Sequence, residues 1–334
     1  MLRRLACIGL AVFGLQSVWA GDGFDDIFGD NGDAEPAAAS VMISGEIGLG
    51  LTYYLDEGWD SQVAASSFSI LKVDGQSDSV EGKAVFSLEA DDTGLPENMT
   101  EIIDELYLRA FFPFGYLTAG LLKVEWGKGD GTHVIDPLNP LVQSGAVQTD
   151  IFEMKKAEVM TLMSLYLGET GLLELVYKPF FHPLQFAREG RWNLGLPGTT
   201  STDTNNLEYS QAAARLTGSL GFFDLGALFY YGFMSEPGFE FTTTFTGTNP
   251  IDPTHYTTTI NEALTRAQLF GLEGVLAAGP LTIRTELGYW LTEDTAADAP
   301  ELYNDRFVYL GGVDMMIPRT SIFLSFQVTG AYVF

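Results

Sequence analysis

Apolar and polar residues alternate along many segments of this chain, and each alternation continues for about ten residues or more. Between Phe223 and Phe233 every odd-numbered residue is apolar or aromatic, whereas Asp224, Gly226 and Gly232 fall on the other side. Successive side chains of a strand point to opposite faces. Globular strands are commonly about 5–6 residues long, and membrane strands about 9–11. The pattern therefore predicts long strands with one lipid-facing side.

The same alternation predicts thirteen strands, at 40–54, 66–73, 81–90, 102–112, 115–126, 157–167, 171–179, 207–217, 221–233, 266–278, 281–292, 303–316 and 321–334. The predicted fold class is all-β, a transmembrane antiparallel β-barrel of about 12–14 strands with short periplasmic turns and long extracellular loops. A secreted β-sandwich is the alternative. It would not need an apolar stripe on every strand, so the barrel is favoured.

The connections between the predicted strands are short and long in turn. Short turns occur near Pro113, Gly168, Gly218–Gly221, Gly279 and Pro318, and long polar stretches cover 127–154, 180–206, 234–264 and 293–303. This is the asymmetry of bacterial barrels, whose periplasmic turns are short and whose extracellular loops are long. The Thr-rich stretch 234–264 is expected to extend its strands as a hairpin above the membrane.

The odd strand count conflicts with a simple barrel, because bacterial barrels have an even number of strands. Short periplasmic turns would make the last strand run outward and would put Phe334 on the outer side. Three explanations remain open: a missed strand, a loop at 66–73, or a chain shorter than its relatives. The segment 66–73 has the weakest strand pattern of the thirteen.

The N-terminus has the anatomy of a secretory signal peptide. Arg3 and Arg4 precede an apolar stretch, and Val18-Trp19-Ala20 forms a small-residue cleavage site. We therefore expect residues 1–20 to be a signal peptide, 21–39 an acidic periplasmic segment and 40–334 the barrel. The only cysteine, Cys7, lies in the signal peptide, so the mature chain is expected to contain none.

Composition narrows the function further. The chain has 44 acidic and 17 basic residues among 334, a net charge of −27, yet 46% of its residues are hydrophobic. Such apolar content excludes a disordered chain. The shortage of clustered Lys and Arg excludes nucleic acid as a partner. One cysteine and three dispersed histidines match no metal-ligand spacing, so no cofactor and no metal is expected.

An enzyme is not expected either. A hydrolase at the barrel rim would need a His beside a Ser or an Asp, and His133, His182 and His255 all fall in predicted loops without such a pattern. His182 and His255 are interpreted as solvated loop residues. A rim hydrolase is therefore kept as the third and weakest hypothesis.

The run Ala119–Gly127 ends in Trp126-Gly127 and is followed by Val134–Pro140, which contains an Asp-x-x-Asn-Pro turn. This arrangement resembles a porin-like family of outer-membrane proteins of unknown function. Glu105–Arg109, Tyr177–Pro179 and Arg284–Glu286 agree with it. The resemblance spans most of 40–330 and is specific at 102–140. It implies a porin-like barrel in the outer membrane. Members are often longer, so a shortened member would explain the odd count.

The candidate site consists of ionisable residues on the polar strand faces and in the long loop 127–154. They are Glu105, Arg109, Lys123, Glu125, Asp130, His133, Asp136, Arg215, Arg284 and Glu286. Charge inside a membrane protein faces water or a partner and often marks a solute path. The structural alternative is mutual neutralisation of pairs that lie two or four residues apart, such as Glu105/Arg109 and Arg284/Glu286.

Loop 127–154 is the candidate constriction of the pore. Gly127, Gly129 and Gly131 permit a sharp inward bend, and Pro137 and Pro140 stiffen the returning arm. We expect this loop to hold Asp130, His133 and Asp136 in the lumen and to set pore size and selectivity, in preference to 234–264. An ordinary external loop is the alternative. The Gly-rich run is not a phosphate loop, because the Gly-Lys-Ser/Thr ending is missing.

The sequence thus predicts a bacterial outer-membrane channel for passive uptake of small solutes that prefers cations. The alternative is a non-conducting barrel that acts in adhesion or interaction through its long loops. The expected partners are outer-membrane lipid, small solutes and the barrel-assembly machinery. The machinery would read the terminal Phe334, with Tyr332, Val328 and Phe326 in step. The sequence does not determine the oligomeric state.

Overall fold

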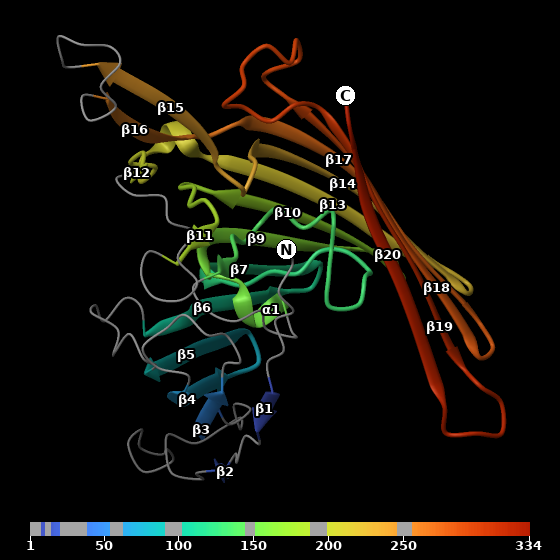
Figure 1. The fold of residues 1–334 in the computed structure, drawn as a ribbon. Coiled ribbons are helices and arrows are strands. Elements are labelled where there is room, and N and C mark those ends of the chain that lie inside the picture. Colours follow the sequence, from blue (N-terminus) through green and yellow to red (C-terminus); the bar gives the residue numbers. More distant parts are fainter. Residues whose placement is uncertain are drawn as a thin grey trace. The chain divides into compact units, whose positions relative to one another are not determined.

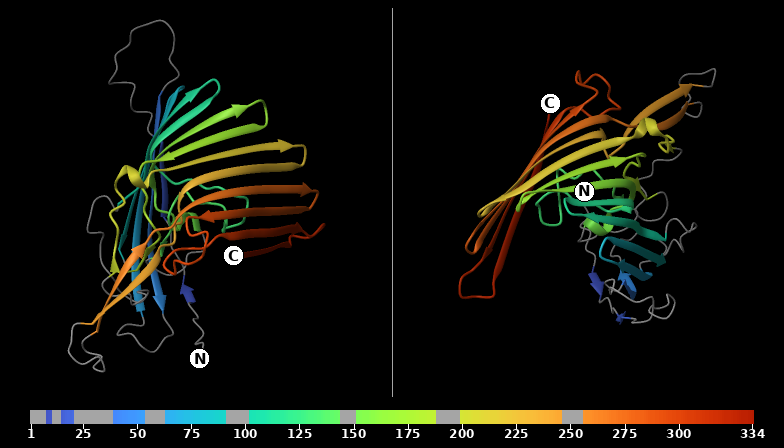
Figure 2. Two further views of the ribbon diagram at one scale, coloured as in Figure 1. Left: turned by 90° about the horizontal axis from the view of Figure 1, so that it is seen from above. Right: turned by 180° about the vertical axis from the view of Figure 1, so that it is seen from behind.

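The computed structural model describes residues 8–10, 15–20, 39–53, 63–90, 102–143, 151–187, 199–245 and 256–334 (Figure 1). The chain divides into two compact units, the first ending at Leu122 and the second beginning at Lys123. Both consist almost entirely of antiparallel strands (Figures 1 and 2). No helix in the described ranges is long and apolar enough to cross a membrane. The predicted acidic segment 21–39 lies outside the described residues, apart from Ala39.

The first unit is a meander of five strands. They are β3 (Ser40–Tyr53), β4 (Val63–Gln76), β5 (Val80–Ala90), β6 (Ile103–Phe112) and β7 (Gly115–Leu122). Each strand pairs antiparallel with the next along the chain. Within the predicted signal peptide, β1 (Ile8–Leu10) and β2 (Leu15–Ala20) pair with β3 in the full-length chain. Cleavage of that peptide stays a prediction.

The second unit contains eight long strands and several short elements. The long strands are β9 (Glu158–Leu167), β10 (Gly171–Lys178), β13 (Gln211–Leu220), β14 (Phe223–Phe233), β17 (Arg266–Ala278), β18 (Leu281–Thr292), β19 (Arg306–Met316) and β20 (Phe323–Val333). They pair antiparallel in this order. The short elements are β8 (Val142–Gln143), α1 (Ile151–Met154), β11 (Gln185–Phe186) and the 3-10 turn η2 (Leu207–Tyr209).

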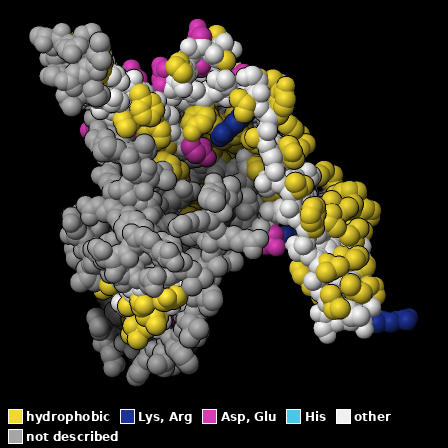
Figure 3. Space-filling view, in the orientation of Figure 1, with side chains coloured by type: hydrophobic (Ala, Val, Ile, Leu, Met, Phe, Trp, Pro, Cys, Tyr) yellow, Lys and Arg dark blue, Asp and Glu magenta, His cyan; other side chains and the backbone are white. Residues whose placement is uncertain are grey.

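The two faces of the second sheet differ as the alternation predicts. In β14, Leu225, Phe229 and Tyr231 are exposed, whereas Leu228 and Tyr230 on the opposite face are buried. Figure 3 shows hydrophobic side chains over the outer surface of the arm that β18–β20 form in Figure 1. Isolated apolar residues on a protein surface are ordinary, but a continuous apolar face is not. This face is the lipid-facing side of a transmembrane β-sheet.

The predicted fold class is confirmed by strand length, pairing and turns. Most strands have 10–14 residues. Two-residue turns join β6 to β7 and β17 to β18, whereas long connections follow β7, β10, β14 and β18. Antiparallel strands joined in this pattern form the membrane barrels of outer membranes. The boundaries differ most at β7, which ends at Leu122 and not at Trp126, and at β13, which begins at Gln211 because Leu207–Tyr209 form η2.

The segment 66–73 belongs to a strand, which removes one explanation of the odd count. It lies inside β4, whose fourteen residues pair with β3 on one side and, over Ser67–Gln76, with β5 on the other. All thirteen predicted strands are therefore present. The direction of the last strand also follows the prediction. The Phe334 backbone N–H donates to Asp305 O (3.0 Å), so Phe334 lies at the end that carries the long connections.

The Thr-rich stretch forms the predicted hairpin. Strands β15 (Gly238–Phe245) and β16 (Tyr256–Ala263) pair antiparallel, and β12 (Thr199–Thr200) joins β16 in parallel. The hairpin projects beyond the ends of β14 and β17 (Figures 1 and 2). His255 and the rest of the hairpin tip lie outside the described residues.

Candidate functional site

The segment from Lys123 to Leu141 leaves the sheet and lies on the non-lipid face of the second unit. Val124 marks the departure, because both of its backbone polar groups bond to side chains. Its N–H donates to Asn139 Oδ1 (2.8 Å), and its carbonyl accepts from Lys155 Nζ (2.8 Å). A backbone group bonded in this way cannot join a strand ladder. Lys123 and Glu125, expected on a strand face, therefore belong to this segment, which we call the constriction segment.

Three apolar side chains fix the constriction segment to the sheet. Trp126, Ile135 and Leu138 are at most 1% exposed. A Cβ atom at Gly288 of β18 would lie 2.9 Å from Ile135 Cγ2, so the glycine leaves the space that Ile135 fills. Burial of a large apolar side chain stabilises by about 1.5–3 kcal/mol. The segment is therefore a packed element, not an ordinary external loop.

Glu286 of β18 is the main polar anchor of the constriction segment. Its Oε1 accepts backbone N–H bonds from Lys128 (2.6 Å) and Gly129 (2.7 Å), and its Oε2 accepts one from Val134 (2.8 Å). Its side chain is fully buried, with 0% exposure. Hydrogen bonds to an ionised carboxylate are roughly twice as strong as neutral ones. One side chain thus holds both arms of the bend in place.

His133 links this anchor to the exposed side of the segment. Its Nδ1 lies 2.9 Å from Glu286 Oε1, and its Nε2 lies 2.7 Å from Glu125 Oε1. Gly127 makes the arrangement possible, because its φ is +115° and an added Cβ would lie 2.4 Å from Glu286 Oε1 and 2.5 Å from His133 Nδ1. The predicted glycine bend is therefore present, and here glycine is needed for space as well as for its backbone angle.

Asp130 forms the tip of the segment and is tethered to β20. Its N–H donates to Gln327 Oε1 (2.8 Å), and Gln327 Nε2 donates to its carbonyl (3.3 Å). Its own carboxylate is 65% exposed and lies 3.9 Å from Arg284 Nη1, whose guanidinium pairs with Asp314 at 2.5 Å. Asp130 is thus the predicted loop acid that faces open space.

Asp136 faces the interior of the segment, which corrects the expectation that it lines the lumen. Its carboxylate pairs with Lys155, and the two side chains are 5% and 4% exposed. Burial raises the pKa of the Asp136 carboxyl, while the Lys155 ammonium acts against that rise. The physical reason for the inward position is Lys155 itself, a buried cation that needs an anion. Lys178 likewise donates to the carbonyl of Leu138.

Arg215 of β13 is the centre of a buried charge cluster beneath Trp126. It donates to Glu174 Oε2 (3.3 Å) and to Glu273 Oε1 (2.7 Å), and its guanidinium lies 5.8 Å from the Trp126 ring centre. The Trp126 Nε1 and Glu273 Oε2 atoms are buried without a hydrogen-bond partner among the described residues.

Glu105 and Arg109, in the first unit, form ion pairs across strands. Lys83 pairs with Glu105 (2.7 Å), and Arg109 pairs with Glu81 (3.2 Å) and donates to Thr118 Oγ1 (3.0 Å). The structural alternative paired Glu105 with Arg109 along one strand, but these ion pairs join neighbouring strands. Glu81 lies directly opposite Arg109, and Lys83 lies diagonally across from Glu105, which is still within reach of long side chains. Arg284 likewise pairs with Asp314, and Glu286 contacts His133.

His182 lies in a loop, as predicted, with a side chain that is 32% exposed, and it also makes two polar contacts. Its Nδ1 lies 2.9 Å from Glu158 Oε1, and its Nε2 lies 3.2 Å from Asn205 Oδ1. Its contacts among the described residues include no serine hydroxyl, so they do not form a nucleophile–base pair. In the same described ranges, no three His, Cys, Asp or Glu side chains are arranged to hold a metal ion.

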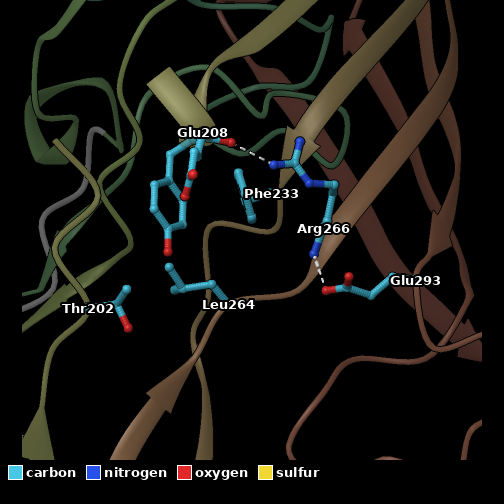
Figure 4. Close-up of a pocket in the computed structure, with 7 residues that line it drawn as sticks. Thr202, Glu208, Phe233, Leu264, Arg266 and Glu293 are labelled. Atoms are coloured by element: carbon cyan, nitrogen blue, oxygen red, sulfur yellow. Dashed lines mark hydrogen bonds between the residues drawn. The ribbon is translucent and has the colours of Figure 1, made fainter. Parts of the chain in front are cut away.

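A separate pocket of about 310 Å³ lies at the end of β14 and β17 (Figure 4). Arg266 dominates it: its guanidinium donates to the Glu208 carbonyl (2.7 Å) and lies 4.4 Å from the Phe233 ring centre, and its N–H donates to Glu293 Oε1 (2.8 Å). These contacts tie η2 and β18 to the strand ends. The pocket is therefore built around a structural arginine, which the sequence did not single out.

Several residues of the site were missed by sequence reasoning. Asn139, Lys155, Lys178 and Gln327 hold the constriction segment through backbone groups far away in the sequence. Asn139 and Lys178 had a local signal, because they belong to the Asp-x-x-Asn-Pro turn and to the Tyr177–Pro179 run. Lys155 and Gln327 had none, because a side chain that bonds to a distant backbone group follows no periodic sequence pattern.

No protein-family model and no curated protein matches this chain. Among solved structures, a loop-deletion mutant of OmpT, an outer membrane protein of Vibrio cholerae, is 13% identical with a TM-score of 0.46, covering 88% of this chain and 83% of that one. Salmonella typhi OmpF in complex with daunomycin is 8% identical with a TM-score of 0.45, covering 88% and 78%. A porin structure is 12% identical with a TM-score of 0.30, covering 88% and 100%.

Proposed function

We propose that this chain is a bacterial outer-membrane channel through which small solutes diffuse, narrowed by the constriction segment. One observation carries the proposal: the segment lies on the non-lipid face and is fixed to β18 by Glu286 and to β20 by Gln327. An element anchored in this way keeps one position, as a pore constriction must. The mechanism is passive diffusion past its tip.

The constriction segment carries two exposed acidic groups, one of them at its tip. Asp130 is 65% exposed and Glu125 is 46% exposed, and the net charge becomes −29 once Arg3 and Arg4 leave with the signal peptide. Rings of carboxylates favour cations in channels. We therefore propose that the channel prefers cations, which refines the general channel function.

In a planar bilayer with a KCl gradient, the reversal potential of the refolded protein is expected to be displaced toward the equilibrium potential of K⁺, which indicates cation preference. Asp130→Asn should reduce the preference, because it removes the exposed charge at the tip. The preference should weaken near 1 M salt, where the Debye length is about 3 Å. The control is Glu169→Gln, in the turn between β9 and β10, which should leave the reversal potential unchanged. Anion selectivity of the wild-type pore would contradict the proposal.

The mature protein is expected to begin near Gly21 and to fractionate with outer membranes. Signal-peptide anatomy and a continuous apolar sheet face support this location. N-terminal sequencing of the membrane fraction tests it directly. Retention of residues 1–20, or a soluble periplasmic pool, would be the contrary result.

The second candidate function is a non-conducting barrel that acts through its loops. The exposed hairpin β15–β16, with a cross-strand Thr243–Thr258 hydroxyl contact of 3.1 Å, favours it. Planar-bilayer conductance separates the two functions, because an interaction barrel whose lumen is filled by ion pairs would pass no current. A silent bilayer with correctly folded protein would favour the second candidate.

A further inference from the structure

We infer that Glu125, His133 and Glu286 form a proton-dependent latch that holds the constriction segment closed and opens when His133 loses a proton. This inference rests on the proposed function, because the latch controls the same segment. Glu286 and His133 are then positioning residues. The pore is expected to widen as the pH rises.

The geometry requires both ring nitrogens of His133 to be donors. Each nitrogen lies within 2.9 Å of a carboxylate oxygen, one on Glu286 and one on Glu125. A neutral imidazole donates from one nitrogen and presents a lone pair at the other. That lone pair would face a carboxylate oxygen, which is also an acceptor. While both glutamates are ionised, only the imidazolium form satisfies both contacts, and it neutralises one of the two negative charges.

The surroundings of His133 favour the charged ring. Burial alone disfavours imidazolium, but the hydrogen bonds to Glu286 and Glu125, and then the charges of Glu286 and Asp136, outweigh it. The pKa of His133 is therefore raised above 6.5. Lys155, which follows α1, compensates Asp136, and Arg284 on β18 pairs with Asp314 and lies 3.9 Å from Asp130.

The direction of the pH effect follows from this raised pKa. A group whose pKa is higher in the folded state stabilises that state fully below its ordinary value and loses the effect as pH rises. The latch is thus intact below about pH 6.5 and weakens as the pH rises through the raised pKa. Neutral His133 has one donor for two carboxylates, so one of its two contacts is lost. The tip is then held only by the backbone bonds to Glu286 and by Gln327, and it detaches more readily, while the buried base around Ile135 and Leu138 stays packed.

The first measurement is single-channel conductance between pH 6 and pH 9. Wild-type conductance should rise along a one-proton curve about two pH units wide. His133→Gln has one donor group and no titrating ring, so its conductance should stay at one level across the range. Glu125→Gln removes one carboxylate and should shift the wild-type midpoint to lower pH. A one-unit shift would change the closed population about ten-fold at a given pH.

A second measurement does not depend on conduction. The mature chain is expected to contain no cysteine, so Thr132→Cys reports the exposure of the tip through its rate of reaction with a charged methanethiosulfonate. The matched control is Thr132→Cys in the His133→Gln background. Division of the first reaction rate by the control rate corrects for the titration of the thiol itself. The ratio of the two rates should increase from pH 6 to pH 9 as the latch opens.

Identical pH profiles for wild type and His133→Gln in both measurements would overturn the latch. If conductance is absent at every pH, the proposed channel fails, and the thiol ratio still decides whether the latch exists. If the wild type conducts but the ratio is flat, the channel stands and the latch fails. A conducting wild type whose conductance and thiol ratio both rise supports both ideas.

Discussion

Replacement of Glu286 by alanine is expected to free the tip of the constriction segment and to raise single-channel conductance. The side chain accepts three backbone N–H bonds, from Lys128, Gly129 and Val134, and contacts His133. A net hydrogen-bond contribution of about 0.5–1.5 kcal/mol each, more for charged partners, makes the docked position weaker by several kcal/mol. About 3 kcal/mol already changes a population by roughly a hundred-fold. Conductance and open-channel noise in a planar bilayer measure the effect.

Two comparisons make the result specific. Glu286→Gln keeps one acceptor oxygen and loses the charge, so its conductance should lie between the wild-type and alanine values. Trimming 240–260 in the β15–β16 hairpin should leave conductance unchanged, because the hairpin projects away from the sheet. If Glu286→Ala folds and conducts like the wild type, the constriction lies elsewhere. If alanine prevents folding, the glutamine variant decides the question.

Replacement of Lys155 by alanine is expected to lower the free energy of unfolding by about 3–5 kcal/mol at pH 7.5, the usual cost of removing one partner of a buried ion pair. Lys155 pairs with Asp136 and also donates to the Val124 carbonyl, and both charged side chains are at most 5% exposed. Its loss leaves a buried carboxylate and a buried carbonyl. Urea unfolding of protein refolded in lipid vesicles measures the change.

The neighbouring lysine provides a matched control. Lys156 is exposed, so Lys156→Ala should change stability by no more than about 0.5 kcal/mol. Burial raises the pKa of Asp136, and without Lys155 the carboxyl has a still stronger reason to bind a proton. The Lys155→Ala defect should therefore shrink as the pH falls toward 4.5 and grow as the pH rises. Asp136→Asn in the same background should restore part of the stability. Equal losses for both lysines would contradict the ion-pair account.

Sequence alone determined the strand architecture. All thirteen predicted strands are present, and the Thr-rich stretch forms its hairpin. These features depend on a period of two, on turn residues such as Gly279-Pro280 and on contacts between neighbours in sequence. A membrane adds a further constraint, because every strand must turn an apolar side to lipid and have its backbone groups bonded. Because such constraints act on every residue of a strand, they produce an alternation from which the strands can be predicted.

The weakest predicted strand shows the same principle from the other side. The segment 66–73 has a blurred alternation, yet it lies within β4, paired on both flanks. The segment is a strand because it forms backbone hydrogen bonds with β3 and β5, although its own alternation is weak. Strand propensity depends on such context, and for this reason the local sequence underestimated its length.

Tertiary structure alone decided what the polar residues do. The structural alternative placed ion pairs along single strands, but the pairs lie between strands, because register places Lys83 near Glu105 and Arg215 opposite Glu174. Register is a property of two strands together.

The glycines and prolines in the sequence located the bend of the constriction segment. They did not predict which of its side chains face the protein interior and which face open space. Asp136 turned toward Lys155 and away from open space, while His133 met Glu286, 153 residues further along the chain. A buried charge takes whichever partner the fold brings within hydrogen-bond distance. That distance is set only when the whole sheet has formed, so no local pattern could encode the partner.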